Sequence, residues 1–193
     1  MAFPNDQSSA VTRRPPDSIA VAVLLIIVVG LAVAIALGVY GGLHEPSGFA
    51  ISVAGFSGPQ PVKAWLATGA ALLAVVQLVS AVVMEGKLPG VIAPPWIHPL
   101  HRWSGRLAVL LTVPVVVHCL YALGFQSATP RVLFHSLLGC FFYGAFTAKM
   151  LLLTRRGLPG WAIPLIGGLV FSALFGLWLT SSLWFFTTVG VKT

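Results

Sequence analysis

The sequence has very little charge. Only 8% of its 193 residues are Asp, Glu, Lys or Arg, and just 4 of them are acidic. A soluble domain carries roughly 25% charged residues, so this chain lacks the polar side chains needed to cover a water-facing surface. A soluble enzyme of any class is therefore excluded, and the outer surface must face lipid.

Cysteine is also scarce. Cys119 and Cys140 are the only two, and both lie within apolar runs. This excludes a disulfide framework and a cysteine-rich metal centre, and it predicts that both side chains act as small buried hydrophobic residues. The sequence also lacks a nucleotide-binding fingerprint, so any reaction with NADH or an iron–sulfur cluster would need another chain.

Long apolar runs dominate what is present. Each reaches the ~20 residues that span a bilayer as a helix, and in lipid only a helix satisfies its own backbone groups. We predict an all-α integral membrane bundle of five transmembrane helices, with a flexible cytoplasmic tail at 1–17 and a single transmembrane domain at 18–190. The predicted helices cover about 18–42, 62–84, 103–125, 132–153 and 161–189.

The net charge of +7 comes from basic residues at the ends of these runs, which indicates contact with lipid headgroups rather than nucleic acid. Lys63, Arg131 and Lys192 lie on the C-terminal side of the predicted bundle, and all other basic residues lie on the N-terminal side. The positive-inside rule therefore predicts a multi-pass protein of the cell membrane, with its N-terminus cytoplasmic and its C-terminus outside.

A short connection at 126–131 predicts that the third and fourth helices are antiparallel neighbours. His118 and His135 each lie about eight residues from its middle, so a rise of ~1.5 Å per residue places them at nearly one depth, roughly 10 Å inside the outer face. Ionisable groups inside a membrane are costly and indicate function. The two imidazoles are a candidate pair of ligands for one haem iron.

Other residues near this pair fit a haem. Gly139 follows His135 by one turn and would let a flat macrocycle approach the backbone, and Tyr121 is a candidate hydrogen-bond donor. Arg131 and Lys63 lie at the outer surface, where haem propionates need cations. Two other interpretations stay open for the histidines, namely a structural hydrogen bond between helices and another metal or a proton relay.

A second group of polar residues lies on the cytoplasmic side. His101 begins the third predicted helix and is a candidate ligand for a second haem. Arg102, Arg106 and Lys149 lie on the same side. They are predicted to extend toward the headgroups, with a polar pocket for a quinone headgroup or an acidic partner as the alternative.

Two short segments resemble known families. His135-Ser136-Leu137-Leu138-Gly139 resembles the His-Ser-x-x-Gly haem-ligand motif of the transmembrane di-haem cytochromes of the ascorbate- and ferric-reductase type. Segment 101–105, His-Arg-Trp-Ser-Gly, resembles their His-Arg-x-x-Gly motif. Those cytochromes have six helices and two histidine pairs, whereas this chain has five predicted helices and one pair matched in depth.

Segment 101–105 also resembles the His-Arg-x-Ser-Gly segment in the membrane anchor of succinate dehydrogenases. This resemblance implies that Ser104 and Arg102 contact a quinone. Over most of its length, the chain resembles a family of small uncharacterised actinobacterial membrane proteins, for example in segments 63–69 and 141–146. That resemblance supports the topology and implies no activity.

Two functions are therefore predicted. The first is a b-type cytochrome-like electron-transfer subunit, with one haem b near the outer face, that exchanges electrons with a quinone or a respiratory partner. The second is a cofactor-free accessory or assembly subunit of a respiratory membrane complex, in which small residues of the first helix pack against a larger partner. These are Gly30, Ala32, Ala34, Ala36 and Gly38. A transporter or channel is disfavoured, because no acidic residue lies at mid-membrane.

Overall fold

A computed structural model describes residues 16–49 and 58–192 of the chain, so most of the predicted tail at 1–17 lies outside the described residues. The structure is built from helices, which confirms the all-α prediction. The main helices are α1 (Pro16–Leu43), α2 (Pro59–Met84), α3 (Ile97–Val117), α4 (Pro130–Leu152) and α5 (Ala162–Trp178). Two of them continue in wider π-helical turns: α3 runs into η1 (His118–Leu123), and α5 runs into η2 (Leu179–Leu183) and then α6 (Trp184–Thr188).

Within the described residues, five helical segments are long and apolar enough to cross a membrane, as the sequence predicts. They are Ile19–Leu43, Pro59–Met84, Ile97–Leu123, Pro130–Leu152 and Ala162–Thr188. The third begins six residues before its predicted start at 103, because the polar segment that contains His98 and His101 is helical. Polar residues do not end a helix where it emerges from the hydrocarbon core.

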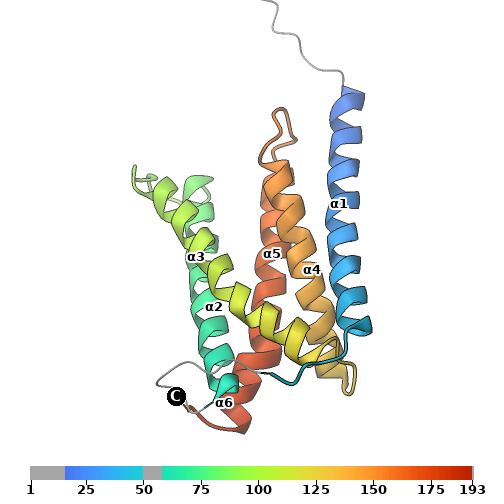
Figure 1. Ribbon diagram of the computed structural model, residues 1–193. Coiled ribbons are helices and arrows are strands. Elements are labelled where there is room, and N and C mark those ends of the chain that lie inside the picture. Colours follow the sequence, from blue (N-terminus) through green and yellow to red (C-terminus); the bar gives the residue numbers. More distant parts are fainter. Residues whose placement is uncertain (1–15, 50–57, 193) are drawn as a thin grey trace, which may run out of the picture.

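The helices are arranged in a different order in space than in sequence (Figure 1). The most extensive contacts join α1 to α4, α4 to α5, α5 to α2, and α2 to α3. Figure 1 shows α3 crossing the bundle obliquely and diverging from α4. The prediction that the third and fourth helices are packing neighbours is therefore wrong for most of their length, although Tyr143 Oη of α4 donates a hydrogen bond to Thr112 Oγ1 of α3 at 2.9 Å.

Glycine explains why α4 packs on α1. A Cβ atom on Gly30 would lie 2.8 Å from the carbonyl oxygen of Gly144, and one on Gly144 would lie 2.9 Å from Ala34 Cβ. The two backbones therefore touch, with Ala148 one turn further along the same face of α4. Because lipid is as apolar as the helix surfaces, close backbone packing of small residues decides which helices associate.

Polar side chains explain why α3 packs on α2. Gln77 Nε2 of α2 donates hydrogen bonds to the carbonyl oxygen of His101 and to Ser104 Oγ of α3. Ser80 Oγ lies 2.8 Å from His101 Nδ1. Hydrogen bonds between helices are favoured in a membrane, since lipid offers polar groups no other partners. The short connection between α3 and α4 fixes only the ends of these two helices. The hydrogen bonds to α2 therefore decide where the rest of α3 packs.

Candidate functional site

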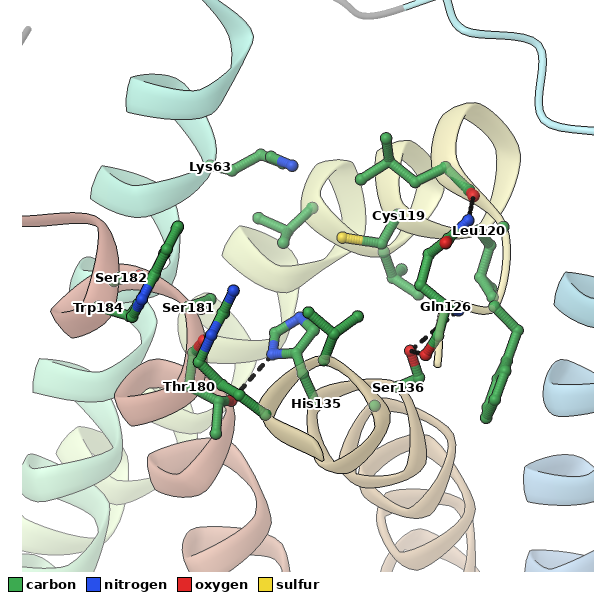
Figure 2. Close-up of a pocket in the computed structure, with 18 of the residues that line it drawn as sticks. Lys63, Cys119, Leu120, Gln126, His135, Ser136, Thr180, Ser181, Ser182 and Trp184 are labelled. Atoms are coloured by element: carbon green, nitrogen blue, oxygen red, sulfur yellow. Dashed lines mark hydrogen bonds between the residues drawn. The ribbon is translucent and has the colours of Figure 1, made fainter. Parts of the chain in front are cut away.

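A cavity of about 390 Å³ lies at the end of the bundle where α3 connects to α4 (Figure 2). This is the end predicted to face outward. Its volume lies within the range of roughly 300–1,000 Å³ that is typical of small-molecule sites. Apolar side chains from α1, α3, η1, α4 and α6 form much of its wall; they include Leu37, Val115, Val116, Leu120, Leu123, Val132 and Phe185.

The two π-helical segments flank this cavity. Cys119 of η1 lines one side, and Thr180, Ser181 and Ser182 of η2 line another. π-helical turns are rare and occur frequently at functional sites, because the widened turn redirects side chains and backbone carbonyls. Their presence on both sides of one cavity marks it as the strongest candidate for a binding site.

His135 points into the cavity from α4. Its Nδ1 atom lies 3.0 Å from Thr180 Oγ1, and its other ring nitrogen, Nε2, faces the cavity interior (Figure 2). Among the described residues, Nε2 has no hydrogen-bond partner. This geometry is typical of a histidine that binds a metal through one nitrogen while a neighbour orients it through the other. Gly139, one turn further along α4, also lines the cavity, and a Cβ atom there would approach only Leu177 Cδ2, at 3.9 Å.

Two cations lie beside His135. Arg131 and Lys63 both line the cavity, and Figure 2 shows the Lys63 side chain extending over it from α2. Arg131 Nη1 donates to the carbonyl oxygen of Thr180 at 2.6 Å, and the guanidinium lies over the Trp184 ring with Cζ 3.9 Å from its centroid. No acidic side chain is among the described residues that line the cavity. The polar end of the cavity is therefore positively charged and suits an anionic ligand.

The hydroxyl residues of η2 were not predicted as site residues. Ser182 is fully buried, and its Oγ is the one buried side-chain N or O atom in the described part of the chain that lacks a hydrogen-bond partner. An unsatisfied buried hydroxyl costs about 1–3 kcal/mol, and because Ser182 is 0% exposed its Oγ lies behind the surface of the cavity rather than on it. The run Thr180-Ser181-Ser182 inside an otherwise apolar helix was the sequence signal for these residues.

Two residues predicted to act with His135 lie elsewhere. His118 is the first residue of η1, but it is not among the residues that line the cavity; its neighbour Cys119 is. The Tyr121 ring stacks on His44, with the two ring centroids 5.0 Å apart, and His44 Nε2 lies 3.1 Å from the Tyr121 carbonyl oxygen. Tyr121 therefore packs on the loop that follows α1.

The candidate residues on the side predicted to be cytoplasmic lie in or beside the α2–α3 interface. Ser104 is only 3% exposed; its hydroxyl lies 2.7 Å from the Leu100 carbonyl oxygen and accepts the Gln77 amide. His101 contacts Ser80 through Nδ1. Arg102 is exposed, and none of these three predicted site residues lines the cavity. Gln77 and Ser80 were not predicted, because a single glutamine or serine in an apolar run has no distinctive spacing.

The described residues contain no cluster of three or more His, Cys, Asp or Glu side chains able to hold a metal ion. A metal bound by protein side chains alone usually needs at least three such ligands. His135 can still hold a metal that brings its own in-plane ligands, as the iron of haem does. With Arg131 and Lys63 for carboxylates and an apolar wall for the ring, the residues at the cavity fit this group.

The fold and the cavity define a multi-pass helical membrane protein with a cavity between its helices. The chain belongs to a family of unknown function (DUF6529), whose model matches residues 21–193. No curated protein and no solved structure matches it.

Proposed function

We propose that this chain is a b-type cytochrome-like electron-transfer protein of the cell membrane that binds one haem in the cavity beside His135. The observation that carries the proposal is the orientation of His135, whose Nε2 faces the cavity while its Nδ1 contacts Thr180. When bound, haem would supply a one-electron iron centre able to exchange electrons with a quinone or a respiratory partner.

The chain's residues have separate tasks in this proposal. His135 Nε2 would bind the iron, and Gly139 would leave room for a flat ring beside α4. Arg131 and Lys63 would bind the propionates, because both line the cavity and no acidic side chain is among the described residues that line it. The apolar residues of α3 and η1 exclude water, which tunes the reduction potential of a buried haem.

His135 is the one histidine among the described residues that line the cavity, so it would be the chain's ligand to the iron. His118, the other histidine of the predicted pair, is not among those residues, and its part in binding is tested by substitution. A six-coordinate, low-spin spectrum that is lost in His118→Ala would establish the predicted histidine pair.

The test is a dithionite-reduced minus oxidised visible spectrum of the full chain, purified in detergent, with a pyridine haemochrome count. We expect about one haem b per chain, lost in His135→Ala and retained in the control His98→Ala, since His98 is exposed. A featureless spectrum from protein produced with ample haem would rule out the cytochrome proposal.

The accessory-subunit alternative was predicted from small residues of α1, several of which pack within the chain itself. Gly30 and Ala34 pack against Gly144 of the chain's own α4, and Gly38 faces Cys140. Of the small residues proposed to contact a larger partner, only Ala32 and Ala36 are exposed.

A further inference from the structure

Thr180 contacts both of the candidate ligand-binding groups on α4. Its hydroxyl oxygen lies 3.0 Å from His135 Nδ1, and its carbonyl oxygen accepts a hydrogen bond from Arg131 Nη1 at 2.6 Å. His135 and Arg131 are one turn apart on α4, so a single residue of η2 orients both. Thr180 is therefore placed to determine what His135 presents to the cavity.

The hydrogen-bond geometry shows which partner donates. Thr180 Oγ1 lies 2.8 Å from the Gly176 carbonyl oxygen and 3.2 Å from that of Leu177. The distance to Gly176 is typical of O–H···O, and the 3.0 Å distance to His135 is typical of N–H···O. A threonine hydroxyl has one hydrogen, and two oxygens 2.8 Å apart repel unless a hydrogen lies between them. The hydroxyl therefore donates to the backbone and accepts from His135.

The tautomer of His135 follows from this assignment. If Nδ1 carries the hydrogen, the neutral ring has a lone pair and no hydrogen on Nε2. Because Nε2 faces the cavity, the site presents an electron-pair donor there and no hydrogen-bond donor (Figure 2).

We propose that Thr180 is a positioning residue that holds His135 in the Nδ1–H tautomer, so that His135 can bind a metal-centred ligand but cannot donate a hydrogen bond to a quinone carbonyl. A metal binds the Nε2 lone pair, whereas a quinone oxygen needs a donated hydrogen that this tautomer does not offer at Nε2. The inference rests on the proposed haem site for its ligand, but the tautomer itself belongs to the ligand-free chain.

The first test measures the ligand-free protein. Nuclear magnetic resonance of full-length chain, labelled with ¹⁵N in its histidine rings, reports which nitrogen of His135 carries the hydrogen. We expect Nδ1 to be protonated in the wild type and in Thr180→Ser, and the Nε2–H form to rise in Thr180→Val. A wild-type ring protonated at Nε2 would overturn the proposal, whether or not the protein binds haem.

The second test is a haemin titration of the same variants. Loss of an outer partner of a metal-binding histidine typically weakens metal binding by about 10–100-fold, and we expect this for Thr180→Val. Thr180→Ser keeps the hydroxyl, so its affinity for haemin should lie within about threefold of the wild-type affinity. Thr187→Val is the matched control, because the partners of Thr187 Oγ1 among the described residues are the Leu183 and Trp184 carbonyls of its own helix.

The outcomes separate the two proposals. Wild-type-like haemin binding by Thr180→Val, or equal loss in Thr180→Ser, would show that the hydroxyl does not position His135. Binding of a short-chain ubiquinone that depends on His135 would also overturn the inferred ligand class. Absence of haemin binding in every variant, with an Nδ1–H ring, would remove the cytochrome proposal and leave the tautomer established.

Discussion

The contact between α1 and α4 gives the sharpest test of the fold. In Gly30→Ala, the new Cβ atom would lie 2.8 Å from the Gly144 carbonyl oxygen and 3.0 Å from Ala148 Cβ. Ordinary contacts begin at 3.4 Å, so the two helices must separate by about 0.6 Å. Because the oxygen belongs to the backbone of α4, no side-chain rotation can relieve the contact.

The expected loss of stability in Gly30→Ala is large for the addition of a single methyl group. Overpacking of this kind typically costs about 1–3 kcal/mol, and a gap of 0.5–1 Å forfeits a quarter to a half of each dispersion contact along the interface. Alanine has a helix propensity about 1 kcal/mol better than glycine, which offsets part of this loss. We therefore expect a net destabilisation of roughly 1–2 kcal/mol.

Gly38→Ala is the matched control on the same helix. A Cβ atom there would lie 3.7 Å from Cys140 Sγ, an ordinary contact, so this variant should be neutral or up to about 1 kcal/mol more stable. Equilibrium unfolding in mixed micelles of detergent and SDS measures both variants. If Gly30→Ala is as stable as Gly38→Ala, the close α1–α4 packing described here is incorrect.

Three further predictions address other parts of the molecule. Gln77→Leu should lower the stability by about 0.6–1.7 kcal/mol in the same unfolding assay, because it removes the hydrogen bonds to His101 and Ser104; no change would mean that these bonds do not hold α3 on α2. Lys63→Gln should weaken haemin binding about tenfold, or about 1.4 kcal/mol, and reduce the salt dependence of binding, because it removes a cation that lines the cavity. The control Lys87→Gln, which alters an exposed lysine paired with Glu85, should change neither quantity. An export-dependent alkaline phosphatase fused after the C-terminus should be active, because the basic residues predict that this end lies outside; an inactive fusion that is stably produced would reverse the orientation.

Part of the candidate site was predictable from sequence. His135, Arg131, Lys63 and Gly139 were predicted on depth, charge and spacing, and all four line one cavity. Position along a helix gives the depth of a side chain in the membrane, since each residue rises by about 1.5 Å. It does not give the direction in which the side chain points, which depends on helix rotation and on local widening of the turn.

Because the direction of a side chain was not predictable, two of the predicted residues, His118 and Tyr121, lie outside the cavity. His118 opens η1, where the turn widens and Cys119 instead lines the cavity. Tyr121, in the same π-helical segment, packs on His44. Thr180 and Ser182 were not predicted, because serine and threonine in a membrane helix usually bond to their own backbone, so even a run of three hydroxyl residues does not by itself indicate a site.

The sequence by itself determined the membrane environment, the five spanning helices and the placement of the start of α1 and the end of α6 at opposite ends of the bundle (Figure 1). These follow from local properties, because apolar length and backbone hydrogen bonding decide whether a segment spans a bilayer. Only the tertiary structure decided which helices pack together and where the cavity lies. In lipid, apolar surfaces do not distinguish one helix from another, so the arrangement depends on a few close contacts, such as Gly30 with Gly144 and Gln77 with Ser104.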